Sequence, residues 1–128
     1  ARDYLMQDPG MARIITELEK PEAGDTWIYL NDQRDNRADT RGKRVMWDPY
    51  AASCLSSGGT RSPALILGHE LAHILGPQAP RTPVANYDDL EEKRVIAGPE
   101  TAAARTLGEG VRTDHRGTYY YVANPILR

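Results

Sequence analysis

The stretch Ser62-Pro-Ala-Leu-Ile-Leu-Gly-His-Glu-Leu-Ala-His-Ile-Leu-Gly-Pro77 contains the strongest helix signal of the chain. Ser62 is a suitable N-cap and Pro63 suits the first helical position. Gly76-Pro77 is a stop signal. Apolar residues occupy nearly every face of the segment between these signals, so we expect this helix to be buried in the core.

Length and composition place this helix in a single domain, residues 1–128. The chain has 128 residues, of which 40% are hydrophobic and 27% charged, as in ordinary globular domains.

The sequence contains no apolar run of about 18 residues, which argues against membrane spanning. A net charge of −2 argues against nucleic acid as the main partner, and one cysteine, Cys54, excludes an internal disulfide. We expect a monomer, and a start at Ala1 with no signal segment is compatible with an excised domain.

The remaining pattern predicts a mixed α+β domain. Apolar spacings of three and four residues indicate helices, and runs of β-branched and aromatic residues indicate strands. Polar or Gly/Ser-rich segments at residues 31–43, 53–62 and 78–87 are interpreted as loops. The expected helices outside the first segment are residues 10–20, 90–97 and 100–107, and the expected strands are residues 25–30, 44–48, 111–113 and 118–123.

The histidines of the buried helix are the main indication of chemistry. His69 and His73 are four residues apart, so they lie on one helix face and can bind one Zn²⁺ with Zn–N distances of about 2.0–2.1 Å. Glu70 is rotated from His69 by roughly 100° and can reach a metal-bound water as a general base without binding the metal. Burying these three side chains without partners would cost several kcal/mol in total, which disfavours an interpretation as ordinary core residues.

A catalytic zinc site of this type needs a third protein ligand from another element and an open fourth position. Position 79 is Ala, which excludes the histidine that metzincins place there. His115 falls in an expected turn and is interpreted as exposed and not ligating. Glu91 and Glu92 follow His73 by 18 and 19 residues at the start of an expected helix, and the residues alone leave the choice between them open. The downstream carboxylate candidates are Asp88, Asp89, Glu91, Glu92, Glu100 and Glu109.

A family resemblance adds to this interpretation. The segment Glu91-Glu92-Lys-Arg-Val-Ile-Ala-Gly98 resembles the E-E-x-x-T-x-G segment that follows H-E-x-x-H in clostridial neurotoxin light chains. The same order of motifs occurs in the NleD-type effector zinc metalloproteases that bacteria inject into host cells. The chain departs from this pattern at Val95, where the family has Thr. By position, the resemblance implies that Glu92 is the third zinc ligand. It also implies that Glu91 contacts one of the ligands and does not itself bind zinc.

The resemblance covers roughly residues 69–121 and includes a late Arg-x-x-Tyr, which is thought to stabilise the oxyanion of the reaction. Arg116-Gly-Thr-Tyr119 has this spacing, and a guanidinium and a phenol at developing negative charge can contribute a few kcal/mol. Arg112 is an alternative to Arg116, and Tyr120 and Tyr121 are alternatives to Tyr119. The predicted catalytic residues are Glu70, Arg116 and Tyr119, and the predicted zinc ligands are His69, His73 and Glu92.

Two further roles are expected near this site. Glu100 and Arg105 could orient one of the zinc-binding histidines, because metal-bound imidazoles usually donate their second N–H to a carboxylate or carbonyl. A surface ion pair between these two residues is the alternative. Residues 44–48 are a candidate sheet edge for pairing with an extended peptide, although packing in the core would explain them equally well.

We therefore expect a compact, minimal zincin-like domain with a small β-sheet packed on the active-site helix, acting as a zinc-dependent endopeptidase. The resemblance implies a bacterial effector or toxin domain, delivered by a contact-dependent or injection system into a target-cell cytosol to cleave a protein there. A cognate immunity or inhibitor protein would be a further partner. Two alternatives stay open: a metal-binding regulatory domain without catalysis, and a zinc amidase acting on a non-protein amide.

Overall fold

The computed structural model describes residues 1–76 and 78–128, and its central helix is the one that the sequence predicts. Helix α3 runs over Pro63–Ile74, and its residues from Pro63 to His73 are all buried. The Ser62 hydroxyl accepts a hydrogen bond from the Leu65 N–H at 3.2 Å. Glu109 in turn accepts hydrogen bonds from the Ser62 N–H and hydroxyl, both at 2.7 Å, which fixes the start of the helix. Pro77, half of the predicted stop signal, lies outside the described residues.

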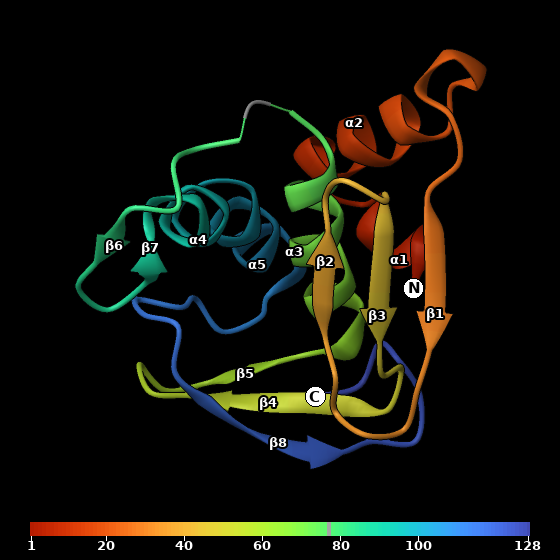
Figure 1. Ribbon diagram of the computed structural model, residues 1–128. Helices are drawn as coiled ribbons and strands as arrows, with labels where there is room; N and C mark the ends of the chain where they lie inside the picture. The colour runs from red at the N-terminus through yellow and green to blue at the C-terminus, as the bar shows by residue number, and fades with distance from the viewer. Residues whose placement is uncertain (77) are drawn as a thin grey trace.

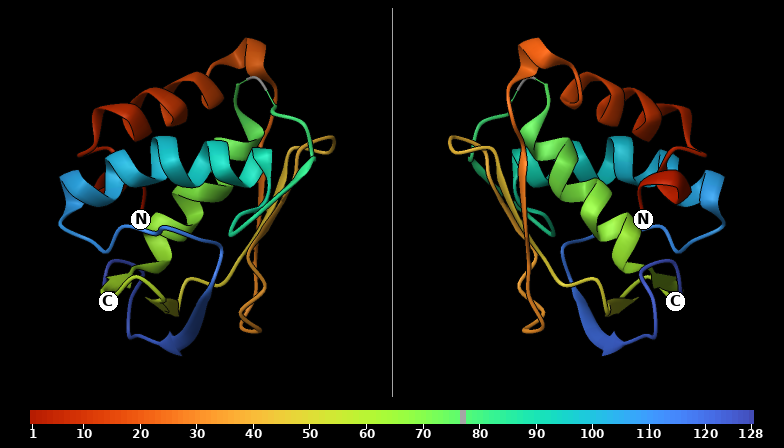
Figure 2. Two further views of the ribbon diagram at one scale, coloured as in Figure 1. Left: turned by 90° about the vertical axis from the view of Figure 1, so that its left-hand side faces the viewer. Right: turned by 90° about the vertical axis from the view of Figure 1, so that its right-hand side faces the viewer.

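The other helices pack around α3. Helices α1, α2 and α4 all contact it, and α2 also contacts α5 (Figures 1 and 2). The bounds are Arg2–Leu5 for α1, Pro9–Leu18 for α2, Leu90–Val95 for α4 and Thr101–Leu107 for α5. Within residues 1–76 and 78–128, the helices lack the combined length and apolar character that crossing a bilayer requires.

A π-helical turn over Ile96–Glu100 joins α4 directly to α5. The sequence predicts a break at Gly98-Pro99, and Gly98 does leave helical geometry, with φ −97° and ψ −105°. The chain nevertheless continues without a loop, because the Thr101 hydroxyl donates to the Ile96 carbonyl oxygen at 2.7 Å across the kink. Glu91 and Glu92 therefore lie on a helix that meets the turn carrying Glu100 at a kink, with no loop between them.

Two three-stranded sheets occupy the other sides of α3 (Figure 2). The first has the order β1-β3-β2, with β1 parallel and β2 antiparallel to β3. The second is antiparallel with the order β5-β4-β8. A two-stranded ladder, β6–β7, precedes α4. The bounds are Trp27–Leu30 for β1, Arg37–Asp39 for β2, Arg44–Trp47 for β3, Ala51–Leu55 for β4, Thr60–Arg61 for β5, Pro83–Val84 for β6, Asp88–Asp89 for β7 and Gly117–Tyr121 for β8.

Several expectations about strands are wrong. The loops expected at residues 31–43, 53–62 and 78–87 contain β2, the β4–β5 hairpin and β6, respectively. Residues 111–113 are not a strand, and β8 pairs with β4 instead, so that Ser53 lies opposite Tyr119. Strand β3 is the centre of its sheet and offers no free edge to a peptide, whereas β2 is an edge strand.

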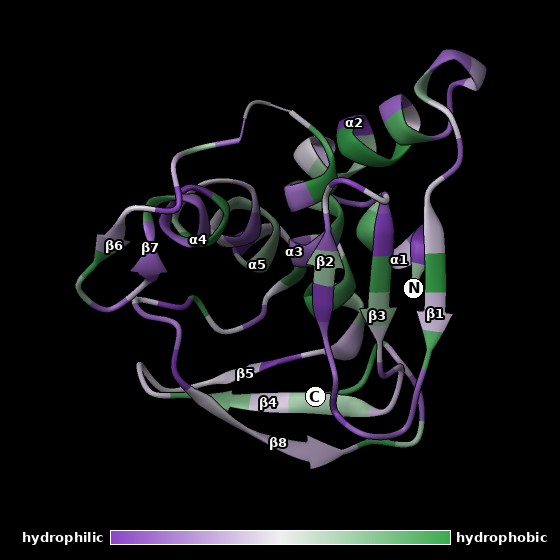
Figure 3. Cartoon of the chain, viewed as in Figure 1, coloured by the Kyte–Doolittle hydropathy of each residue, from purple (hydrophilic) through white to green (hydrophobic). Residues whose placement is uncertain are grey.

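The core joins the helices to the first sheet. Buried apolar side chains from α1, α2, α3, β3 and α4 form one cluster, which includes Leu5, Met11, Val45, Leu65 and Val95. Figure 3 shows hydrophilic residues at the ends of β2 beside the more hydrophobic β3, in agreement with an edge strand next to a central one. The predicted α+β class is confirmed.

Candidate metal centre

Helix α3 brings the two histidines of the His-Glu-x-x-His motif together. The Nε2 atoms of His69 and His73 are 3.1 Å apart, and both residues are buried. Together with one carboxylate oxygen of Glu70, ring nitrogens of these histidines form a group in which all separations are within 4.8 Å. This buried group could hold a metal ion.

Glu92, the predicted third ligand, approaches the two histidines from the first turn of α4. Its backbone N–H donates to the Asp89 side chain at 2.9 Å, so that Asp89 is the N-cap that fixes this turn. Glu92 Oε1 lies 3.1 Å from His73 Nε2, and Glu92 Oε2 lies 3.2 Å from His69 Nε2. The carboxylate therefore faces both imidazole edges, whereas Glu91 lies behind His73. Of the two adjacent glutamates, Glu92 has the position of a third ligand.

The separations among these atoms match those expected around a small cation. In a tetrahedral site with bonds of about 2.0–2.1 Å, neighbouring ligand atoms are about 3.3 Å apart. Both histidines hydrogen-bond a carboxylate through Nδ1, so in the neutral ring the Nε2 atoms carry lone pairs that face one another and Glu92. Positive charge relieves such a contact between lone pairs and an anion, either as a proton on a ring or as a metal ion between the donors. The residues thus fit a metal ion.

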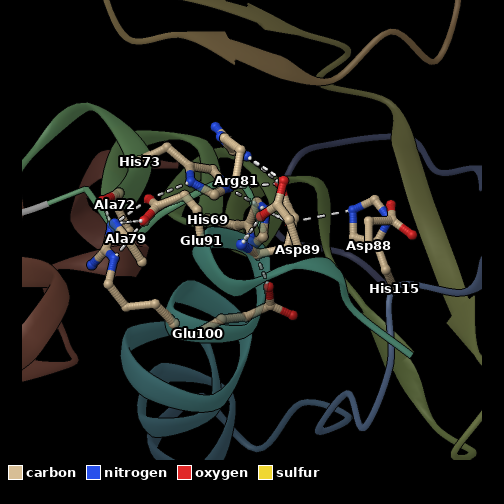
Figure 4. Close-up of polar contacts among 12 residues, drawn as sticks. His69, Ala72, His73, Ala79, Arg81, Asp88, Asp89, Glu91, Glu100 and His115 are labelled. Atoms are coloured by element: carbon tan, nitrogen blue, oxygen red, sulfur yellow. Dashed lines mark hydrogen bonds and ion pairs between the residues drawn. The ribbon is translucent and has the colours of Figure 1, made fainter. Parts of the chain in front are cut away.

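Glu100 hydrogen-bonds His69 at the ring nitrogen Nδ1. Its Oε2 lies 2.6 Å from His69 Nδ1 (Figure 4). Two arginines also bind this carboxylate. Arg112 does so through Nε and Nη2, both at 2.8 Å, and Arg61 through Nη1 at 3.2 Å. Burial would raise the pKa of Glu100, but the charges of Arg61, His69 and Arg112 hold it well below its usual range. Arg105 is exposed, so its predicted pairing with Glu100 is wrong and the buried Arg61 and Arg112 take its place.

Glu91 holds His73 in the same way. Its Oε1 lies 2.9 Å from His73 Nδ1 and 2.7 Å from Arg94 Nη2, and its Oε2 accepts from the Ala79 N–H at 2.6 Å. Burial acts to raise the pKa of Glu91, but these bonds from Arg94 and His73 lower it to about 2. Both supporting carboxylates are therefore ionised at neutral pH and favour positive charge on or between the imidazoles. Burial alone would lower the pKa of His69, yet Glu100 raises it to about 9.

Glu70 lies beside a cavity of about 210 Å³ that opens next to the histidines. The carboxyl group is buried, and this burial raises its pKa. A carboxylate whose pKa is shifted toward neutrality is better suited to accept and return a proton than an exposed one. Glu70 thus has the environment of a general base.

The predicted oxyanion residues lie around the same cavity. Arg116 and Tyr119 both line it, and Tyr119 comes from β8. Tyr121 is exposed, and its hydroxyl donates to the Asp32 carbonyl oxygen at 3.1 Å instead. Arg112 also reaches the cavity wall, but both of its bonds to Glu100 keep its guanidinium behind His69. Arg116 and Tyr119 therefore stay the predicted oxyanion pair, since both line the cavity.

The sequence interpretation of His115 as exposed and not ligating does not anticipate its contact with Glu92. His115 Nε2 lies 3.3 Å from Glu92 Oε2, and His115 Nδ1 lies 2.6 Å from Asp88 Oδ2 (Figure 4). Arg112-Thr-Asp-His115 has the same spacing as the Arg-x-x-Tyr motif, which is the signal that could have pointed to this residue. Its side chain is 37% exposed, in agreement with the predicted exposure.

Comparisons of the chain with family models, with curated proteins and with solved structures gave no match. The resemblance to NleD-type effectors and clostridial light chains therefore stays a prediction from motif order. The function of the site is inferred from its geometry.

Proposed function

We propose that this chain is a zinc-dependent endopeptidase of the His-Glu-x-x-His type. The observation that carries the proposal is the convergence of His69 Nε2, His73 Nε2 and the Glu92 carboxylate at separations of 3.1–3.2 Å, with a buried Glu70 beside them. Two imidazoles and one glutamate are the protein ligands of a common class of catalytic zinc site in proteases. A purely structural zinc site has no need of Glu70.

The chemistry follows from the positions of these side chains. Zinc bound there would polarise a scissile carbonyl and lower the pKa of water. Glu70 takes a proton from the attacking water, whose oxygen adds to the carbonyl carbon, and passes that proton to the nitrogen as the C–N bond breaks. Arg116 and Tyr119 line the same cavity, where they can donate hydrogen bonds to the oxygen that becomes negatively charged.

The neighbourhood of the cavity supports a protein substrate over a small amide. Asn36, which directly precedes β2, lines the cavity together with Glu70. Among residues 1–76 and 78–128, β2 pairs with β3 alone, which leaves its other edge for a substrate strand. An extended peptide added to this edge would continue into the cavity, and such strand addition is a common way to hold peptides. On the resemblance alone, we propose that this substrate is a protein in a target cell that receives the domain from a bacterium.

Metal analysis combined with proteome-wide cleavage mapping tests this function. We expect wild type and Glu70→Gln each to bind about one zinc ion and only wild type to cut proteins. The matched control is Glu22→Gln, an exposed carboxylate on the turn Pro21–Ala23, which should bind zinc and cut like wild type. Wild type without zinc would overturn the proposal, as would undiminished cleavage by Glu70→Gln.

A metal-binding domain without catalysis is the second candidate. The observation that favours it is the imidazole of His115 next to Glu92, on the side where a catalytic site stays open. Zinc binding by wild type with no cleavage in any proteome would support this candidate.

A further inference from the structure

We propose that His115 is a fourth protein ligand of the same metal ion, so that the resting centre is closed at all four corners and opens only when His115 leaves. This inference rests on the metal site of the proposed function but does not depend on proteolysis. In the resting state His115 would occupy the coordination position that the attacking water needs.

The distance from His115 to Glu92 is one that two ligands of the same metal ion would have. His115 Nε2 lies 3.3 Å from Glu92 Oε2, close to the 3.2 Å from that same oxygen to His69 Nε2. Both values agree with the edge of about 3.3 Å expected for a tetrahedral zinc site. Within the described residues, the buried Glu92 Oε2 has no hydrogen-bond partner. An unpaired carboxylate oxygen between two imidazole nitrogens is accounted for by a cation that all three bind.

All three histidines of the chain share one arrangement. Each Nδ1 atom meets a carboxylate, which is Glu100 for His69, Glu91 for His73 and Asp88 for His115. Each Nε2 atom then faces the carboxylate of Glu92. Metal-bound histidines almost always donate their second N–H in this way, because the bond fixes the tautomer and the ring orientation. His115 therefore has the environment of a ligand as well as the distance.

The β6–β7 turn is shaped to hold His115. The His115 N–H donates to the Asn86 carbonyl oxygen at 2.7 Å, and the Asp88 side chain meets the ring. Asn86 and Asp88 both have left-handed backbone conformations, with φ of 74° and 66°. Such conformations cost free energy outside glycine and persist where the surroundings enforce them, commonly at functional sites. The turn thus fixes both the main chain and the side chain of His115.

His115 is also the ligand that can leave. It lies between Arg112 and β8 in a segment without helix or strand, and its side chain is 37% exposed. His69 and His73 are fixed within a buried helix and have side chains only 4% and 2% exposed. In Figure 4 His115 and Asp88 lie on the opposite side of the centre from His73 and Glu91. Movement of this segment would vacate one corner and leave the other three ligands in place.

Metal affinity and ligand-field spectra test this inference. Zinc affinity is measured by competition with a chelator, and the visible spectrum is recorded after loading with Co²⁺, for wild type, His115→Ala, Asp88→Asn and the loop control Thr113→Ala. We expect His115→Ala to weaken zinc binding by at least about tenfold and to alter the Co²⁺ bands, and Asp88→Asn to weaken binding less. Thr113 is exposed on the same segment, and its variant should match wild type.

Unchanged zinc affinity and an unchanged Co²⁺ spectrum in His115→Ala would overturn the inference, whatever happens to activity. If wild type cleaves protein, His115→Ala should cleave faster at saturating zinc, because the fourth coordination position is then free. Slower cleavage by this variant at full zinc occupancy would overturn the proposal that His115 blocks that position. Zinc binding that depends on His115 without any cleavage would instead refute the proposed protease and leave the fourth ligand standing. Far-UV circular dichroism verifies folding, and Asp88→Asn provides the same test should His115→Ala unfold.

Discussion

The two sides of the metal centre use the same chemical pair in different surroundings. On the inner side, Glu91 holds His73 and is fully buried. On the outer side, Asp88 holds His115, and the Asp88 side chain is 68% exposed. Arginines bind the inner carboxylates, whereas water reaches the outer one. From this difference we expect the inner residues of the proposed metal centre to stay in place and exchange at a bound metal to occur from the outer side.

The largest effect is expected from Glu100→Ala on the inner side. The change leaves Arg61 and Arg112 buried without their carboxylate, and removing one partner from a buried ion pair typically costs about 3–5 kcal/mol. Urea unfolding of the metal-free protein measures this loss of stability. Glu100→Gln keeps a hydrogen-bond acceptor and is the milder control. A loss below about 1 kcal/mol for Glu100→Ala would mean that the inner side is not a rigid support.

Changing Glu91 on the inner side and Asp88 on the outer side in parallel compares the two sides directly. Glu91→Gln should lower zinc affinity by about 10–100-fold, the usual cost of losing a carboxylate behind a ligand. Asp88→Asn should cost less, because solvent screens an exposed carboxylate and replaces part of its interaction. Chelator competition gives both values. An equal or larger loss for Asp88→Asn would contradict the assignment of the inner and outer sides.

A variant outside both sides tests whether metal affinity and fold stability are separable. Ser62→Ala removes the N-cap of α3 and its bond to Glu109, which should cost about 1 kcal/mol of stability. We expect zinc affinity to stay within about twofold, because a shift below 0.5 kcal/mol is typical for distant sites. Thermal unfolding and chelator competition on the same sample measure the two effects. A tenfold loss of zinc affinity would show that the two are coupled through α3.

The smallest effect is expected at Tyr4, whose hydroxyl donates to Glu109 at 2.6 Å. Burial and this bond raise the pKa of Tyr4 to about 12, so the folded state favours the neutral phenol. The stabilisation is therefore complete below the ordinary pKa of about 10 and is lost as the pH rises from there to about 12. Tyr4→Phe should lose about 1 kcal/mol at pH 7 and show a weaker decline at alkaline pH in urea unfolding. Parallel curves for the two proteins would contradict this.

The sequence predicts those features that short-range patterns determine. The cap at Ser62 and the apolar run define α3, and the four-residue spacing places His69 and His73 on one face. The resemblance directs attention to Glu92, which the structure places at the ring edges. All of these depend on neighbours within a few turns of the chain.

Long-range pairing explains what was missed. Strand β4 consists mostly of small residues with weak strand preference, and its pairing with β8 joins segments more than 60 residues apart. Arg61 reaches the site only through such pairings, so no local pattern identifies it, and for His115 the one available signal is its spacing from Arg112. The polar β2 likewise becomes a strand because β3 lies beside it.

The π-helical turn at Ile96–Glu100 has a consequence for how this site can vary among related sequences. Since α4 meets α5 at a kink without an intervening loop, each residue added or removed there would change the direction of Glu100 relative to Glu92. Such a change would carry Glu100 away from His69. The interval between these two glutamates should therefore tolerate insertions as poorly as the interval between the two histidines, and it is a signature by which distant homologues could be found.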